Sequence, residues 1–415
     1  MTSTSSFNNQ NPALYTSLAV FLLGSISLVV DSGYSIGCAL LLLGGIYSLF
    51  VRRKLELTRD DWLVLGVLII FGLVNILDVA VHQSGSRYLD KPVRFILAVF
   101  AFALIRKYPP RLSWLWAGLA AGGILTAGWS GYQKFFLDVD RAGGFTFVIQ
   151  YGNISMLIGL FCLAGLAWAY AQPQRGRWVP FMLLGAVGGI LGSLLSGSRG
   201  GWVGLPLVLL VLYRAYSDFV SARVKAAGIT LLVAAAAVVY SVPQFGVQAR
   251  VNLAVSDVQH YLQGNSDSSL GGRFEMWKGA SQLFLQKPVF GWGDINYTPA
   301  MRELVSQGKA HPIVSDFGHA HNEILDNAAK RGMIGVLALL ALYLVPLRLF
   351  AAGLRSPDMT VRSLATAGTL LPVAYIDFGL SQTFFAHNSG VMIYAFWLVV
   401  LWGCYRNAQE PGLGD

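Results

Sequence analysis

Long apolar runs recur along the whole chain, and they constrain its fold more than any other feature. The runs approach the roughly 20 residues that a helix needs to cross a bilayer, and mean hydropathy over the 415 residues is +0.56. Backbone groups in lipid must be satisfied within helices or closed barrels, and these Leu-, Ala-, Gly- and Val-rich runs lack the alternation of barrel strands. The sequence therefore predicts an all-α polytopic membrane protein.

Twelve apolar segments are predicted to be transmembrane helices. Nine of them lie within residues 1–242, a polar insertion follows at 243–331, and the last three lie within 332–415. The twelve segments are 13–30, 34–51, 62–81, 92–105, 112–132, 148–170, 178–196, 201–214, 225–242, 332–352, 361–381 and 388–405.

The polar insertion is expected to fold into a mostly helical cap. The stretch "GGRFEMWKGASQLFLQK" predicts an amphipathic helix that follows a Gly-Gly break, and residues 291–318 contain a second, shorter helical candidate. Four large residues of the first helix fall near one predicted apolar face, namely Phe274, Trp277, Leu283 and Phe284.

The distribution of Lys and Arg predicts which side of the membrane each loop faces. Sixteen of the 30 cations lie in loops on the side of the N-terminus, whereas the opposite short loops hold six. Because cations concentrate on the cytoplasmic side, we expect both termini in the cytoplasm and the insertion outside. The net charge of +9 mostly reflects this bias, so it does not indicate nucleic-acid binding.

The cysteines and the N-terminus indicate neither a disulfide framework nor a cleaved leader. Cys38, Cys162 and Cys404 all lie in apolar segments, without CxxC spacing or a Cys/His partner. The first ten residues, "MTSTSSFNNQ", are polar and lack a basic stretch, so we expect the first span to remain as an uncleaved anchor.

Two arginines are candidates for binding an anionic group on the outer side. Arg199 lies in the Gly/Ser turn "SGSRGGWVG" between two predicted spans, and Arg273 opens the amphipathic helix of the insertion. A guanidinium fork matches phosphate oxygens, and glycines allow close backbone approach to such a group. The alternatives are that Arg199 reaches lipid headgroups and that Arg273 is a solvated surface residue.

The stretch "HAHNEILDNAAKRGMIG", residues 319–335, places histidines and charges just before an apolar run. His321 can take a proton from a hydroxyl near neutral pH, and Asn322 can orient an imidazole or bind a sugar hydroxyl. Alternatively, His321 is a satisfied polar contact and Asn322 caps the following helix. His319 and His321 could also bind zinc, but no third ligand is evident.

An outer loop carries a D-x-D pair, Asp138 and Asp140, followed by Arg141. D-x-D can hold a divalent cation between a protein and a diphosphate. We favour the alternative, in which Arg141 binds a substrate phosphate and the acids pair with cations. Further candidates near the membrane are Asp377, His387, Asn388, Gln150 and Asn153.

Three blocks of the chain together resemble the O-antigen ligase family and its polymerase relatives. His321, Asn322, Gly332 and Gly335 fit a pattern of H-N, nine residues, then G-x-x-G. "SGSRGGW" and "GGRFEMWKGA" before "FGWG" are similar to the two arginine-bearing blocks of that family. The resemblance implies a GT-C-like layout of twelve spans with a large outer loop between spans nine and ten.

The resemblance also implies an activity. Members transfer a preassembled glycan from undecaprenyl pyrophosphate to an acceptor hydroxyl at the periplasmic face of the bacterial inner membrane, and in ligases the acceptor is a lipid A-core sugar. His321 would be the general base, and Arg199 and Arg273 would hold the pyrophosphate. Asn322, Arg141 and His319 are further substrate-binding candidates, and we expect an inverting reaction that needs neither metal nor cofactor.

Other functions fit parts of the same evidence. A repeat-unit polymerase or a protein O-oligosaccharyltransferase shares the donor chemistry, and only the acceptor distinguishes them. A lipid or ion transporter is disfavoured because the candidate site residues lie on one outer face of the membrane rather than at its midplane. The ligase hypothesis requires Arg199, Arg273 and His321 to surround one cavity.

Overall fold

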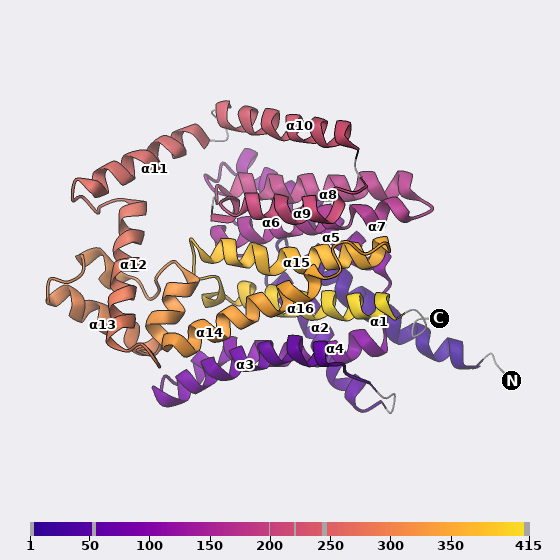
Figure 1. Ribbon diagram of the computed structural model, residues 1–415, viewed down its shortest axis with the longest axis horizontal. Coiled ribbons are helices and arrows are strands. Elements are labelled where there is room, and N and C mark those ends of the chain that lie inside the picture. The colour runs from indigo at the N-terminus through magenta and orange to yellow at the C-terminus, as the bar shows by residue number, and fades with distance from the viewer. Residues whose placement is uncertain (1–3, 52–54, 199, 220, 243–246, 411–415) are drawn as a thin grey trace.

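The protein is a helical bundle with a helical cap at one end. The computed structural model describes residues 4–51, 55–198, 200–219, 221–242 and 247–410, and no strand occurs among them. Both termini lie at one end of the bundle, and the cap helices α12 (Ser269–Gln286) and α13 (Asp294–Ser306) lie at the opposite end (Figure 1). This arrangement fits the predicted separation of the insertion from the termini.

A helix lies at each of the twelve predicted spans, with α6 and α7 together forming the sixth. Among the described residues, five helices are long and apolar enough to cross a membrane: α3, α6 with α7, α8, α14 and α16. All regular secondary structure in the described ranges is thus helical, with the long apolar helices of a multi-pass membrane protein. The bundle helices are α1 (Thr4–Ser25), α2 (Gly33–Leu49), α3 (Arg59–Val81), α4 (Asp90–Lys107), α5 (Leu112–Phe135), α6 (Val148–Ala164), α7 (Leu166–Ala171), α8 (Arg175–Ser196), α9 (Leu205–Tyr216), α10 (Ala222–Ser241), α14 (Glu323–Ala351), α15 (Met359–Gly379) and α16 (Asn388–Gln409).

The core of the bundle surrounds α15 and α16. Every residue of α16 from Ser389 to Tyr405 is buried, as expected of a helix that is apolar on all sides. Glycines elsewhere let helices approach closely. A Cβ on Gly188 of α8 would lie 2.4 Å from the carbonyl oxygen of Gly123 on α5, so only glycine permits this contact.

The cap has an apolar core of its own. It is built by α12, α13 and a 3₁₀ turn at Pro312–Asp316, while α11 (Val247–Leu262) connects α12 to α10. The two predicted helices of the insertion are confirmed. The buried apolar residues of this core are Met276, Ala280, Leu283, Tyr297, Ala300, Met301, Leu304, Ala310, Val314, Ala320 and Ala329.

Two details predicted for α12 are wrong. Its N-cap is Ser268, which accepts a hydrogen bond from the Gly271 N–H at 3.0 Å, so the Gly-Gly pair lies inside the helix and Arg273 lies in the second turn. The predicted apolar face is also rotated. Leu283 is buried in the cap core, but Phe274 and Trp277 are half-buried and lie outside that core, where they contact each other edge to face and Phe274 also contacts Tyr261 of α11.

A break at Gly332 divides α14 into two parts. Gly332 has φ 62° and ψ −155°, a conformation that is essentially restricted to glycine. The loop before α13 docks at this break: the Met333 N–H donates to the Pro288 carbonyl at 2.8 Å, and the Gly293 N–H donates to the Lys330 carbonyl at 2.8 Å. The "FGWG" block and the first glycine of the G-x-x-G pattern, Gly332, therefore belong to one contact, whereas Gly335 packs against its own helix.

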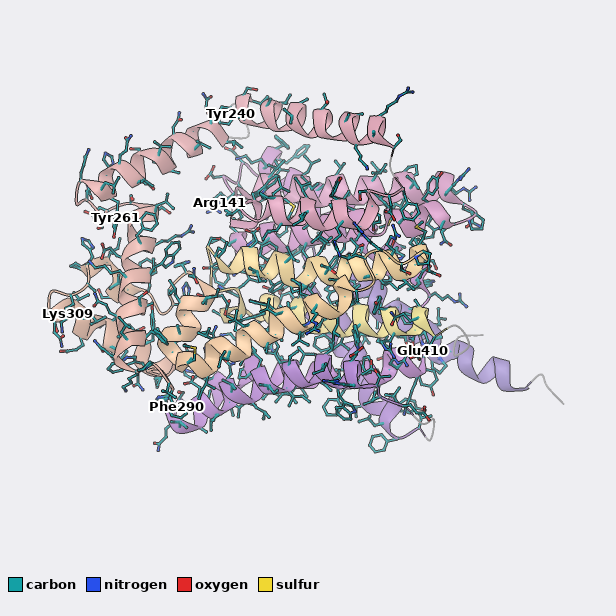
Figure 2. All side chains as sticks on the ribbon, viewed as in Figure 1. Arg141, Tyr240, Tyr261, Phe290, Lys309 and Glu410 are labelled. Atoms are coloured by element: carbon teal, nitrogen blue, oxygen red, sulfur yellow. The ribbon has the colours of Figure 1, made fainter. Side chains whose placement is uncertain are left out.

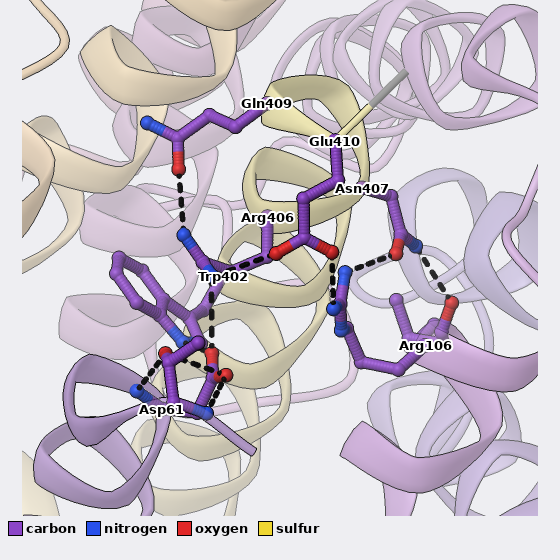
Figure 3. Close-up of polar contacts among 9 residues, drawn as sticks. Asp61, Arg106, Trp402, Arg406, Asn407, Gln409 and Glu410 are labelled. Carbon is purple, nitrogen blue, oxygen red and sulfur yellow. Dashed lines mark hydrogen bonds and ion pairs between the residues drawn. The ribbon is translucent and has the colours of Figure 1, made fainter. Parts of the chain in front are cut away.

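Polar contacts lock the bundle at the end that holds the termini (Figure 3). Asp61 is fully buried, accepts a hydrogen bond from Trp402 Nε1 at 2.9 Å and lies 3.4 Å from Arg406 Nε. Glu410 in turn pairs with Arg406 and Arg106, each at 2.7 Å. These contacts fix the end of α16 against α3 and α4.

We predict that Gly332→Ala destabilises the fold strongly. The backbone conformation alone costs about 1 to 3 kcal/mol for a residue with a Cβ, and that Cβ would also lie 2.3 Å from the Val289 carbonyl oxygen. Gly66→Ala in α3 is the control, since no atom lies within 4 Å of the position that its Cβ would take. The midpoint of thermal unfolding in detergent should fall for the first variant only, and equal midpoints would contradict this account.

Candidate active site

The His321–Asn322 pair lies in a tight turn that leads into α14. Asn322 caps this helix, because its Oδ1 accepts hydrogen bonds from the N–H groups of Ile324 and Leu325, both at 3.1 Å. His321 has φ 49°, a left-handed conformation that non-glycine residues adopt mainly in turns. The capping alternative for Asn322 is therefore confirmed, and this cap fixes the position of the neighbouring imidazole.

Two histidine rings meet in this turn. The ring centroids of His319 and His321 are 4.3 Å apart, and within the part of the chain that the structure describes neither Nδ1 has a hydrogen-bond partner. Burial, followed by the nearby His319 and Arg273, lowers the pKa of His321 to about 4. Burial also lowers the pKa of His319. Both rings are thus neutral at pH 7, and His321 can accept a proton.

Arg141 and Arg273 line one cavity of about 190 Å³, which we call the cationic cavity. Arg141 lies at the end of the bundle that carries the cap (Figure 2). Its guanidinium is held by the Ser196 carbonyl at 3.1 Å and the Ser198 hydroxyl at 3.4 Å. The remaining lining residues are Ile149, Gly197, Ser198, Gly200, Leu253, Ala254, Asp257, Ser269, Leu270 and Ser381.

The charges around the cationic cavity favour an anionic ligand. Burial, and then the charge of Arg141, lowers the pKa of Arg273, so two cations share one small space. Arg273 forms no ion pair with any residue that the structure describes. The one carboxylate in the wall, Asp257, accepts the Leu270 N–H at 3.4 Å. A group with several anionic oxygens fits two guanidinium forks.

Arg199 lies outside the residues that the structure describes. Its two neighbours, Ser198 and Gly200, both line the cationic cavity. The turn predicted to bear an anion-binding arginine therefore contributes to the same cavity as Arg273. His321 is not among the lining residues, so the expectation that one cavity holds His321 together with the arginines is not met. The histidine turn lies close by, because Asn322 Nδ2 is 3.5 Å from the carbonyl of Leu380, the residue before Ser381 of the cavity wall, and Arg273 lowers the pKa of His321.

The loop between α15 and α16 links the cationic cavity to the histidines, and sequence reasoning largely missed it. Ser381 lines the cavity. Gln382 Nε2 lies 3.4 Å from His387 Nε2, and Gln382 also acts on the pKa of His321, which it raises against the larger effect of burial. No motif marked Ser381 or Gln382. The one available signal was the second His-Asn pair that begins at His387.

The charged residues that follow the histidines have a structural role. Lys330 is buried and contacts Asp294 at 2.7 Å, Asp326 at 3.1 Å and the Gly318 carbonyl at 2.9 Å. Despite the opposing effect of burial, the charge of Lys330 holds the pKa of Asp294 below its usual value. One ammonium group thus joins α13, the histidine turn and α14. These contacts explain why charged side chains stand just before a membrane-length apolar helix.

Two of the further candidates support the Gly/Ser turn. Asp377 accepts a hydrogen bond from the Gly204 N–H at 2.6 Å, which holds the end of the turn against α15. Asn153 lies beside the same turn, since a Cβ on Gly201 would be 2.8 Å from its Oδ1. The side chains of Gln150 and Asn153 are buried and have no hydrogen-bond partner among the residues described.

The D-x-D pair lies at the surface. Asp138 is exposed, and Asp140 is exposed and lies 3.8 Å from Lys134. The predicted pairing of the acids with cations is thus found for Asp140. Across the described residues, no group of three or more His, Cys, Asp or Glu side chains is placed to hold a metal ion.

Comparisons with known proteins identify the central part of the chain. Residues 183–340 match the family model described as O-antigen ligase. A protein of Haemophilus influenzae, named only as uncharacterized, is 27% identical over 369 residues, which cover 88% of this chain and 92% of that protein. An O-antigen ligase of Escherichia coli K12 is 26% identical over 223 residues, which cover 53% of this chain and 52% of that relative.

The described site thus consists of a histidine with a lowered pKa and, near it, a cavity that two arginines line. Residues 183–340 match the O-antigen ligase family, and a curated O-antigen ligase is similar over about half of the chain, so the resemblance drawn from the motifs is confirmed. The matched segment contains Arg199, Arg273 and the His321–Asn322 pair, whereas Arg141 and the α15–α16 loop lie outside it. The family implies a glycosyltransferase-like enzyme of O-antigen ligase or polymerase type.

We predict that the cationic cavity binds inorganic pyrophosphate in the presence of EDTA. Removing one charged hydrogen-bonding group should weaken binding about tenfold to a hundredfold, so Arg273→Gln should show that loss by isothermal titration calorimetry. Arg302→Gln is the matched control, because Arg302 is exposed on α13 and is not a lining residue of the cationic cavity. Unchanged affinity in Arg273→Gln, or equal losses in both variants, would refute this site.

Proposed function

We propose that the protein is an O-antigen ligase that transfers a preassembled glycan from undecaprenyl pyrophosphate to a sugar hydroxyl of lipid A-core. One observation carries the proposal: His321 is neutral at pH 7 and lies next to a cavity that two arginines line. The family match over residues 183–340 supports it. A base for a hydroxyl and a cationic site for a diphosphate are the two requirements of this reaction.

The proposed step is a direct displacement at the anomeric carbon. His321 takes the proton of the acceptor hydroxyl, and the acceptor oxygen forms a bond to the anomeric carbon. The bond from that carbon to the pyrophosphate oxygen breaks, and its electron pair leaves with undecaprenyl pyrophosphate. Attack opposite the leaving group inverts the linkage. A positioned base of this kind contributes roughly 10² to 10⁴ in rate.

The arginines stabilise the charge that the leaving group gains. Arg273 and Arg141 line the cationic cavity from the cap and from the outer loop, and we assign Arg199 the same role from its place in the lining turn. Guanidinium groups that are held before the reaction cost little reorganisation as charge develops. We therefore propose a metal-independent and cofactor-independent reaction. His319 and Asn322 position His321 through the ring contact and the helix cap.

The arrangement of the bundle supports a periplasmic site in the inner membrane. The candidate site lies at the cap end, opposite both termini (Figure 1). The excess of Lys and Arg in the loops on the side of the termini favours a cytoplasmic position for that end. We therefore propose that both termini are cytoplasmic, that the membrane's own lipids surround the bundle, and that donor and acceptor lipids meet at the periplasmic face.

The proposal is tested by glycan transfer with purified protein in detergent and EDTA. Undecaprenyl pyrophosphate glycan and core-bearing lipid A are the substrates, and wild type is compared with His321→Ala. His260→Ala is the control, since His260 is exposed on α11. A ladder of glycosylated lipid A that is lost only in His321→Ala supports the ligase. Lengthening of the donor without transfer to lipid A would indicate the polymerase, and no change in either lipid would favour the transporter.

The pH dependence of kcat/KM provides a second test of His321. The base must be unprotonated, and the pKa of His321 is lowered to about 4. Activity should therefore rise with pH through about 4 and stay flat between pH 6 and pH 8, because kcat/KM reports the free enzyme. An activity that is half-maximal near pH 6.5 or above would mean that another group, or a histidine with an unshifted pKa, is the base.

A further inference from the structure

A second cavity opens at the other end of the α15–α16 loop. It has a volume of about 500 Å³ and is lined by Tyr34, Lys91, the segment Phe145–Phe147 and the segment Ala386–Ser389. Its size falls within the range of ligand pockets. Resting on the proposed function, we propose that this cavity binds the acceptor, and that the acceptor is an anionic saccharide whose negative group contacts Lys91.

Two loops connect this acceptor cavity to the cationic cavity. The outer loop after α5 places Arg141 on the cationic cavity and Phe145–Phe147 on the acceptor cavity. The α15–α16 loop likewise places Ser381 on the first and His387 on the second. Since the same two loops line both cavities, the donor and the acceptor would meet where these loops run side by side.

His321 lies near the junction. The ring of His387 contacts Gln382 at 3.4 Å, and both Gln382 and His387 influence the pKa of His321. Burial, then His319 and then Lys91, lowers the pKa of His387 to about 4. Lys91 thus acts electrostatically on His387, and His387 acts in the same way on His321. An acceptor in this cavity could present a hydroxyl to His321 while its charged group lies at Lys91.

Lys91 is the cation that this cavity offers to an anion. It is half-buried and forms no ion pair within the ranges that the structure describes. The two carboxylates that attract Lys91 most strongly form ion pairs with other cations. Asp90 pairs with Arg94 at 2.8 Å, and Asp294 pairs with Lys330 at 2.7 Å. Asp294 and Asp90 still act on Lys91 from a distance, but no carboxylate of the described residues pairs with it, so a ligand that supplies a close negative charge would stabilise this half-buried ammonium.

The rest of the wall suits a sugar better than a lipid tail. Aromatic side chains of Tyr34, Phe145 and Phe147 offer flat faces for a sugar ring. The Oδ1 of Asn388 is buried and has no hydrogen-bond partner among the described residues, so it can accept a bond from a sugar hydroxyl. His387 packs its ring edge to face against Phe147 at 5.1 Å. Such a wall combines apolar contact with a few placed polar groups.

The test compares a phosphorylated core oligosaccharide with the same oligosaccharide after phosphatase treatment. Binding to purified full-length protein is measured for wild type, Lys91→Gln and Lys91→Arg. Lys309→Gln is the matched control, because Lys309 is exposed at the far tip of the cap (Figure 2). We expect Lys91→Gln to weaken binding of the phosphorylated form about tenfold or more. We expect Lys91→Arg and Lys309→Gln to bind as wild type does.

The outcomes separate this inference from the proposed function. If wild type binds both oligosaccharides equally, or if Lys91→Gln binds the phosphorylated form as wild type does, the acceptor cavity is refuted even where glycan transfer succeeds. If wild type binds as predicted but transfers no glycan, the proposed ligase activity fails instead. In a transfer assay, Lys91→Gln should raise the KM for the acceptor and leave the KM for the donor unchanged. A rise in the donor KM alone would overturn the assignment.

Discussion

The docking of the "FGWG" loop at the break in α14 is the contact on which the arrangement of the site depends. Gly332 interrupts a membrane-length helix, and the loop's carbonyl oxygens at Pro288 and Val289 accept hydrogen bonds from the residues that follow the break. The short helix before the break is thereby separated from the long apolar helix after it. Its N-terminus carries the Asn322 cap and places His321 beside the cap helices.

A buried ionic cluster holds that short helix against the cap. Lys330 joins Asp294 and Asp326, and a buried charge of this kind is tolerated only when its partners are all in place. Removing one partner would leave the others uncompensated, so the cluster favours one geometry over alternatives. The same ammonium also binds the Gly318 carbonyl just before the histidines. Rigid support of this sort is what a positioned base requires.

Sequence reasoning predicted the positions of the helices because membrane-length apolar runs leave few alternatives. It also predicted the resemblance, since Arg199, Arg273 and His321 stand in short, separate motifs. It did not find the α15–α16 loop, because Ser381 and Gln382 carry no pattern and gain meaning only through contacts with distant segments. The rotated face of α12 was missed for a related reason. Phe274 contacts Trp277 and, on α11, Tyr261, and hydrophobic periodicity does not specify which partners an aromatic residue takes.

Lys91 is another residue whose candidate role could not be predicted from the sequence. It lies at the start of an apolar helix, where an arginine or lysine ordinarily indicates only a membrane boundary. Its lack of an ion pair among the described residues follows from the pairing of Asp90 with Arg94 and of Asp294 with Lys330, and the second of these joins segments more than 30 residues apart. A candidate acceptor site therefore emerges only once the folded neighbours are known.

The most direct measurement is a cryo-electron microscopy structure of the protein bound to undecaprenyl pyrophosphate. The account predicts that the diphosphate lies between Arg141, Arg273 and the turn at 197–200, with the imidazole of His321 beside the oxygen to which the glycan would be attached. A diphosphate bound elsewhere, such as against Lys330 and Arg331, which line a separate cavity together with Asp294 and Glu323, would contradict the assignment of donor site and base together.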